Sequence, residues 1–149
     1  MVWAGFSAAR KLRLAFTSNL MNSGEYQRVL QDCLLPFLRL PNGNNFTFMQ
    51  DNVPIHRSRS TRYWLTAQNI NVLPWPDYSP DLNPIENLRG ILVRRIYAEN
   101  RQFQTRKELQ EAILEAWQEI EQRTIDNLFR SMPNRLFQLI QCNEGPIDY

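Results

Sequence analysis

One stretch decides how this chain is interpreted: Ser79-Pro80-Asp81-Leu82-Asn83-Pro84-Ile85-Glu86-Asn87-Leu88, taken together with Gln50-Asp51-Asn52 upstream. Asp51 follows the alternating apolar run Phe46-Thr47-Phe48-Met49, which is typical of a strand. Glu86 lies further along, in the first turn of a predicted helix. Hard divalent cations prefer clustered oxygen ligands, so two such acids can converge on one cation. Two cations held in this way favour phosphodiester chemistry, because they activate the attacking oxygen and stabilise the leaving one.

The composition is that of one globular domain. A chain of 149 residues with 43% hydrophobic residues can build one core, and we expect residues 1–149 to form a single domain. No apolar run approaches the ~20 residues that span a bilayer, and no signal peptide is expected because Arg10 and Lys11 follow the first apolar residues. Two cysteines and a single histidine exclude the usual kind of zinc cluster and indicate a reducing intracellular compartment.

The basic residues are almost all arginines. Of 17 basic residues only Lys11 and Lys107 are lysines, and the planar guanidinium of arginine suits phosphate contacts. Genomic composition is the alternative explanation of this bias. The positions favour DNA, because arginines follow both candidate acids and could hold a DNA backbone. These predicted DNA-binding residues are Arg57, Arg59, Arg62, Arg89, Arg94 and Arg95, with His56 beside them.

The hydrophobic pattern predicts a mixed order of strands and helices. Strands are expected at residues 2–7, 11–17, 46–50 and 70–73. A helix is expected from Ser23, with an apolar stripe of Tyr26, Val29, Leu30, Cys33, Leu34 and Phe37. Further helices are expected around 63–65, from Pro84 to about Tyr97 and after the capping box Thr105 to Glu108, and one or two short helices are expected around 124–131 and 134–141. A turn cluster at 41–45 ends the first helix, and Ser58 or Ser60 caps the second. This β-β-α-β-α-β-α-α order predicts an α/β layer architecture.

Several segments resemble the catalytic domain of Tc1/mariner-type DDE transposases. They are Met1 to Ser7, Met21-Asn22-Ser23, Gln50 to His56, Ser79 to Leu88, Ser131 to Arg135 and Ile147-Asp148-Tyr149. The resemblance implies an RNase H-like fold, in which a mixed sheet is flanked by helices. It also implies metal-dependent DNA strand cleavage and transfer, DNA transposition and integration, and location in the nucleus. Transposon ends and target DNA are the implied partners, and the family acts as dimers.

The family active site uses three acids and two Mg²⁺ (or Mn²⁺) ions, and the resemblance identifies Asp51 and Glu86 as the second and third acids. The family's first acid lies on a strand upstream of the segment that matches Met1, so we expect the first catalytic strand to be missing. Glu25 and Asp32 precede Asp51, but both fall in a helical pattern and do not replace that acid. The family's helix-turn-helix region is expected to be absent too. The interpretation is a partial catalytic domain that is inactive alone.

Each candidate residue also has a structural explanation. Asp51 can form an Asx turn, and Glu86 can complete a capping box with Asn83 at the start of its helix. His56 can contact DNA, position a phosphate or only form a hydrogen bond near the site. Trp75 and Tyr78 can stack on bases or pack the proline-rich loop.

Asp77 and Asp81 lie in the loop before the helix, and the family motif gives Asp81 a structural role there. Arg89 stands where the family usually has tryptophan. The alternative function is a catalytically inactive, transposon-derived module that binds nucleic acid or another partner. A third alternative is a reading frame that makes no stable protein.

Overall fold

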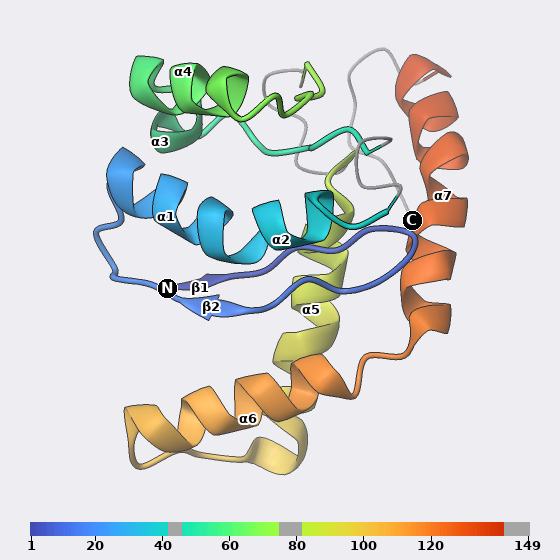
Figure 1. Cartoon of the computed structure of the whole chain (residues 1–149). Helices are drawn as coiled ribbons and strands as arrows, with labels where there is room; N and C mark the ends of the chain where they lie inside the picture. The colour runs from blue at the N-terminus through green and yellow to red at the C-terminus, as the bar shows by residue number, and fades with distance from the viewer. Residues whose placement is uncertain (42–45, 75–81, 142–149) are drawn as a thin grey trace. The chain divides into compact units, whose positions relative to one another are not determined.

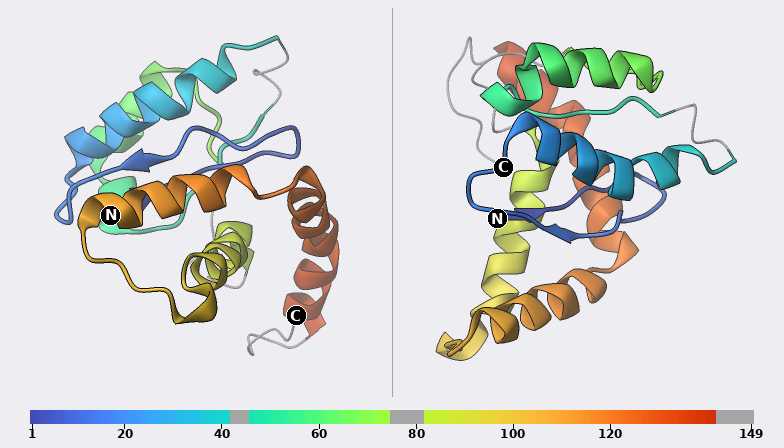
Figure 2. Two further views of the ribbon diagram at one scale, coloured as in Figure 1. Left: turned by 90° about the horizontal axis from the view of Figure 1, so that it is seen from below. Right: turned by 60° about the vertical axis from the view of Figure 1, so that its left-hand side comes forward.

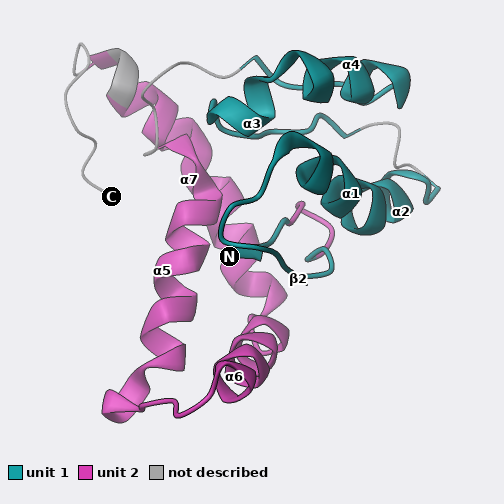
Figure 3. Ribbon diagram, turned by 90° about the vertical axis from the view of Figure 1, so that its left-hand side faces the viewer, with its two compact units in different colours: residues 1–5, 11–79 teal, residues 6–10, 80–149 magenta. Residues whose placement is uncertain are grey.

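The computed structural model describes residues 1–41, 46–74 and 82–141, and its chain divides into two compact units (Figure 3). Unit 1 comprises residues 1–5 and 11–79, and unit 2 comprises residues 6–10 and 80–149. Asp51 belongs to unit 1 and Glu86 to unit 2. A single domain over the whole chain stays a prediction.

In its described residues, unit 1 combines a small antiparallel hairpin with four helices (Figure 1). In the hairpin, β1 (Val2–Trp3) pairs with β2 (Ala15–Phe16), so that Val2 lies opposite Phe16. The N–H of Leu12 also donates to the carbonyl of Gly5 at 2.8 Å, which continues the pairing beyond the two short strands. The helices are α1 (Ser23–Cys33), α2 (Leu35–Leu38), α3 (Pro54–Arg57) and α4 (Arg59–Ala67).

The helices of unit 1 begin at side-chain caps. Asn22 accepts the N–H of Glu25 at the start of α1, and Ser58 accepts the N–H of Thr61 at the start of α4, as one of the two serine alternatives predicted. The predicted apolar stripe of α1 is confirmed, because Tyr26, Val29, Leu30 and Cys33 are all buried. Tyr26 and Leu30 belong to a core cluster that reaches α4 through Leu65.

The strands predicted at 46–50 and 70–73 are wrong in length. The two segments pair in parallel only at Phe48 and Val72. There the N–H of Phe48 donates to the carbonyl of Asn71 at 2.7 Å, and the N–H of Leu73 donates to that of Phe48 at 2.8 Å. Alternation predicts which side chains share a face, but the length of a strand depends on how far a partner runs beside it. Residues 42–45 of the predicted turn cluster lie outside the described residues.

The regular elements of unit 2 among the described residues 82–141 are all helices. Its elements are α5 (Pro84–Ile96), the 3₁₀ helix η3 (Ala98–Asn100), α6 (Arg106–Gln118) and α7 (Gln122–Gln141). Helix α5 packs against both α6 and α7, and Leu88 and Ile125 are fully buried. The predicted start of α5 at Pro84 is confirmed. Thr105 caps α6 as predicted, while the Glu108 carboxylate accepts the N–H of Gln104, one residue before the cap.

The sequence allowed one or two short helices around 124–131 and 134–141, and unit 2 has one there, the 20-residue helix α7, which contains Pro133 (Figure 2). Proline removes one backbone hydrogen bond and usually kinks a helix. Here Leu128 before the proline and Arg135 after it are both buried. We infer that this packing holds the two halves in one helix and offsets the lost bond.

None of the helices in residues 1–41, 46–74 and 82–141 combines the length and the apolar character that crossing a membrane requires.

Candidate active site

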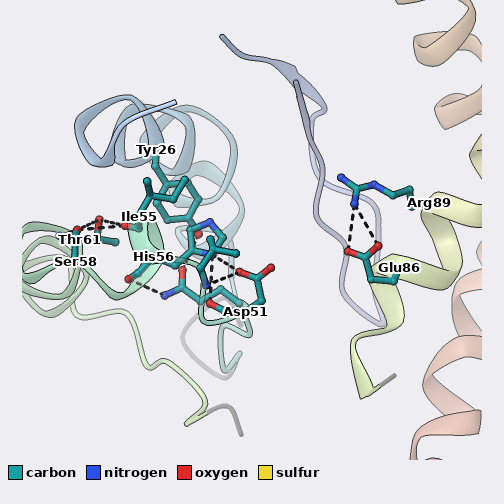
Figure 4. Close-up of polar contacts among 10 residues, drawn as sticks. Tyr26, Asp51, Ile55, His56, Ser58, Thr61, Glu86 and Arg89 are labelled. Atoms are coloured by element: carbon teal, nitrogen blue, oxygen red, sulfur yellow. Dashed lines mark hydrogen bonds and ion pairs between the residues drawn. The ribbon is translucent and has the colours of Figure 1, made fainter. Parts of the chain in front are cut away.

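Asp51 lies just before α3, and the backbone and side chains that follow it hold its carboxylate (Figure 4). Its Oδ1 accepts the N–H of Val53 at 3.3 Å, which is the Asx turn that the sequence allowed. The same Oδ1 lies 2.7 Å from Nδ1 of His56. No described residue donates to Oδ2, and the side chain is 44% exposed. The turn and a ligand role are therefore compatible, because they use different oxygens.

Helix α1 supports the His56 ring through Tyr26. Its ring stacks on the Tyr26 ring with centroids 4.1 Å apart. The Tyr26 hydroxyl donates to the side-chain oxygen of Gln50 at 2.6 Å, and burial raises the pKa of that phenol, with a further increase from the negative charge of Asp51. The contacts of Tyr26 and Gln50 with this site were missed from the sequence. Periodicity marked Tyr26 only as a core residue of α1.

Glu86 lies in the first turn of α5, where an acid is favoured by the helix dipole. The predicted cap is confirmed in Asn83, whose Oδ1 accepts the N–H of Ile85 at 3.3 Å. The capping box with Glu86 is wrong, because the Glu86 carboxylate accepts hydrogen bonds from Arg89 instead, at 3.2 and 3.4 Å (Figure 4). Both side chains of this ion pair are largely exposed. The carboxylate is therefore not used by the helix cap.

The residue after Glu86 anchors α5 to α7. Asn87 accepts a 2.6 Å hydrogen bond from Nη1 of Arg135, whose Nε donates to Oγ of Ser131 at 3.0 Å. Arg135 is only 4% exposed. These residues and Glu86 line a cavity of about 640 Å³ between α5 and α7. The sequence pointed to Ser131 and Arg135 only as part of a family-like ending, and nothing in it predicted that they contact Asn87.

The six predicted DNA-binding arginines are all exposed, and at least two of them already have partners within unit 2. Arg89 pairs with Glu86, and Arg95 donates to the carbonyl oxygen of Glu119 at 3.1 Å. Arg57 ends α3 and Arg59 begins α4, shortly after Asp51. This is where a contact with the DNA backbone was predicted. Their contact with DNA stays a prediction. Trp75, Asp77, Tyr78 and Asp81 lie outside the described residues.

The donor set fits a divalent cation at each acid separately. Asp51 offers a carboxylate oxygen that no described residue engages, and Glu86 offers a carboxylate whose described partner is one exposed arginine. Both are the hard oxygen ligands that Mg²⁺ and Mn²⁺ prefer. Within the described ranges, no three or more His, Cys, Asp or Glu side chains gather into a group that could hold a metal ion.

Comparison with protein families places residues 1–110 in a model described as DDE superfamily endonuclease, a range that includes both acids. The whole chain is 46% identical to the Tc3 transposase of Caenorhabditis elegans and covers 45% of that protein. It is 33% identical over 146 residues to the Tc1 transposase of the same species, covering 96% of this chain and 52% of the relative. The chain thus spans about half the length of these curated relatives.

Two solved structures of Mos1 transposase share the fold. The catalytic domain with raltegravir and magnesium superposes with a TM-score of 0.86 at 19% identity, over 99% of this chain and 76% of that one. The paired-end complex with the left transposon end gives a TM-score of 0.86 at 20% identity, over 99% and 44% of the two chains. The predicted mixed α/β, RNase H-like fold is therefore confirmed.

Proposed function

The chain belongs to the DDE superfamily of endonucleases, in the Tc1/mariner group, and from this premise we propose that Asp51 and Glu86 are two of the carboxylates of a DNA-cleaving and strand-transferring active site. One observation carries the proposal. The family match includes both acids, and each carboxylate is partly exposed. Oδ2 of Asp51 has no donor among the described residues, and the Glu86 carboxylate pairs with an exposed arginine. The similarity to transposases along the whole chain supports this function over an inactive binding module.

Asp51 and Glu86 would hold the cations, Mg²⁺ or Mn²⁺, and we propose two ions in the complete site. When bound, these cations supply Lewis-acid stabilisation of the attacking and leaving oxygens of the phosphodiester. Asp51 presents Oδ2 while the Val53 N–H and His56 retain Oδ1. Glu86 must exchange Arg89 for the cation, which costs little because the exposed pair is weak.

Arginines after each acid would hold the substrate. Arg57, Arg59 and Arg62 follow Asp51, whereas Arg94 and Arg95 follow Glu86 on α5. Their guanidinium groups can bind phosphates of the DNA backbone without sequence preference, so they position the strand and do not select it. We propose that the substrates are transposon ends and target DNA, that the complete enzyme is a homodimer, and that it works in the nucleus. Solved Mos1 structures include a paired-end complex and a strand transfer complex.

A manganese titration of the 149-residue chain tests whether the two acids share a site. Paramagnetic Mn²⁺ broadens the amide signals of nearby residues, so substoichiometric Mn²⁺ should broaden signals around both Asp51 and Glu86. Asp51→Asn should abolish the broadening at both places. The amide signals of residues away from position 51 should stay unchanged, because Asn preserves the size of the side chain.

Two controls sharpen the titration. Asp126→Asn, on the half-buried face of α7, removes an acid outside the proposed site and should leave the broadening as it is in the parent chain. Broadening that persists around Glu86 in Asp51→Asn would show two independent sites and would contradict the shared active site. We expect the 149-residue chain alone to bind Mn²⁺ weakly and to cut no transposon-end DNA, because the proposed site needs a third acid.

A further inference from the structure

The contact between His56 and Asp51 is specific in its atoms. Nδ1 of His56 lies 2.7 Å from Oδ1 of Asp51 and 3.3 Å from the main-chain oxygen of the same residue. An ionised carboxylate and a carbonyl only accept hydrogen bonds, so Nδ1 must carry the hydrogen. The contact therefore fixes the tautomer of the neutral ring. It also engages the same Oδ1 that accepts the Val53 N–H.

The ring is held from behind by a buried residue. Tyr26 is 1% exposed, stacks on His56 with an angle of 29° between the rings, and is anchored by its hydroxyl to Gln50. Nε2 of Gln50 in turn lies 3.5 Å from the carbonyl of His56, at the limit of a hydrogen bond. The His56 side chain is 16% exposed, so the imidazole has little room to turn. The packed Tyr26 thus restricts the His56 ring, and the His56 ring restricts the Asp51 carboxylate.

We infer that His56 is a positioning residue, which holds the Asp51 carboxylate in one rotamer with Oδ1 engaged and Oδ2 presented to a divalent cation. Supporting hydrogen bonds of this kind orient metal ligands, and their loss typically weakens metal affinity by about 10- to 100-fold. The effect on metal binding rests on the proposed function. The fixed rotamer and the fixed tautomer do not, because they are properties of the metal-free chain.

The tautomer is measured directly, because His56 is the only histidine of the chain. A long-range ¹H–¹⁵N spectrum of the neutral ring contains signals from this residue alone. We expect hydrogen on Nδ1 and none on Nε2. Asp51→Ala should remove this preference. Hydrogen on Nε2 in the parent chain would overturn the inference, since Nδ1 would then have nothing to donate.

The rotamer is measured through the three-bond couplings from the Asp51 side-chain carbon to its backbone nitrogen and carbonyl carbon. The parent chain should show one χ1 rotamer. His56→Phe keeps the stack on Tyr26 but removes the donor, so the couplings should become averaged. His56→Asn removes the ring but keeps an N–H in the place of Nδ1, and it should restore the single rotamer. A merely structural role of His56 predicts the opposite order of the two variants.

A Mn²⁺ titration of the His56 variants separates this inference from the proposed function. In a Mn²⁺ titration His56→Phe should bind about 10-fold more weakly than the parent chain, and His56→Asn should stay within about 3-fold of it. Unchanged couplings in His56→Phe, with its thermal unfolding midpoint also unchanged, would overturn the positioning role. Averaged couplings with unchanged Mn²⁺ binding would keep the positioning role and would instead contradict Asp51 as a ligand.

Discussion

The two candidate acids differ in what holds them. At Asp51 the side chain itself is held, by the Val53 N–H and by His56, which the buried Tyr26 supports (Figure 4). At Glu86 the helix is held, by the Asn83 cap and by the contact between α5 and α7, while the carboxylate pairs with one exposed arginine. A helix already fixes the backbone of its residues, whereas a residue between elements needs direct support for its side chain. The fold holds the two candidate ligands by different means.

The largest expected effect tests whether both arrangements serve one reaction. In the complete transposase, Asp51→Asn and Glu86→Gln should each lower the rate of DNA strand cleavage by about 1,000-fold or more, since a lost metal ligand removes several kcal/mol of transition-state stabilisation. The double variant should be little worse than either single one, because the acids act as a unit. Single-turnover cleavage of a labelled transposon-end duplex in Mg²⁺ measures these rates.

The control for this prediction is an acid that the proposal does not use. Asp32→Asn changes an exposed acid of α1 and should leave the cleavage rate within about 2-fold of the parent enzyme. If either acid variant kept most of its activity, the equality of the two acids would be broken. The acid that tolerated substitution would then be a structural residue.

The next effect concerns the support of α5, the helix that carries Glu86. Arg135→Met keeps much of the side-chain length but removes the hydrogen bonds to Asn87 and Ser131. We expect the free energy of unfolding to fall by about 2 kcal/mol, because hydrogen bonds to charged groups contribute about 1.5–3 kcal/mol each and the apolar replacement recovers part of the loss. Urea denaturation followed by circular dichroism measures the change.

The matched control is an exposed arginine on the same helix, Arg130→Met, which should change the stability by less than about 0.5 kcal/mol. A loss in Arg135→Met no larger than in this control would show that the contact between Asn87 and Arg135 does not hold α5. The support of Glu86 would then rest on its cap and on apolar packing.

At Asp51 the corresponding test uses alkaline pH, because burial raises the pKa of the Tyr26 phenol above its usual value of 10.0. Above pH about 10 the unfolded phenol loses a proton that the folded one keeps. The free energy of unfolding therefore falls as pH rises, by up to about 1.4 kcal/mol per pH unit for this one group. Below pH about 10 this contribution is fully present. Urea denaturation at pH about 9, 10 and 11 should show a shallower decline in Tyr26→Phe.

The comparison with Tyr63→Phe makes this slope specific. Tyr63 lies on α4 in the same unit and is 78% exposed, so its substitution should leave the parent decline intact. Equal slopes in Tyr26→Phe and the parent chain would contradict a buried phenol beneath His56. The support that Tyr26 gives to His56 would then be weaker than the stacking of the two rings implies.

Local signals predicted the helices and their starts well. Asn83 and Thr105 cap their helices through side chains of the expected type, and the stripe of α1 is buried, because caps and amphipathic faces depend on residues close in sequence. The strand at 46–50 was predicted too long, because pairing with Val72 depends on a distant segment. Pro133 lies inside α7, where the sequence left one or two helices open.

The same distinction explains which parts of the candidate site were found. Asp51 and Glu86 stand in recognisable motifs, so the sequence predicted both as candidate ligands. Tyr26 reaches His56 and Gln50 across a long stretch of chain, and Arg135 reaches Asn87 over 48 positions. No local pattern encodes such contacts, since the folding of each unit creates them. The sequence thus predicted the candidate ligands and missed the residues that hold them.

The smallest expected effect tests whether Arg89 supports the Glu86 carboxylate or competes with a cation for it. The ion pair of Glu86 with Arg89 is exposed, and such pairs contribute about 0–1 kcal/mol, so Arg89→Ala should change the stability by less than about 0.5 kcal/mol. Without this cation, the Glu86 carboxylate should bind Mn²⁺ about 2- to 3-fold more tightly, whereas loss of the His56 donor weakens binding. Arg94→Ala, at a position further along α5, controls for the general removal of positive charge. If Arg89→Ala weakened Mn²⁺ binding as His56→Phe does, Arg89 would be a support, and the two acids would be held alike after all.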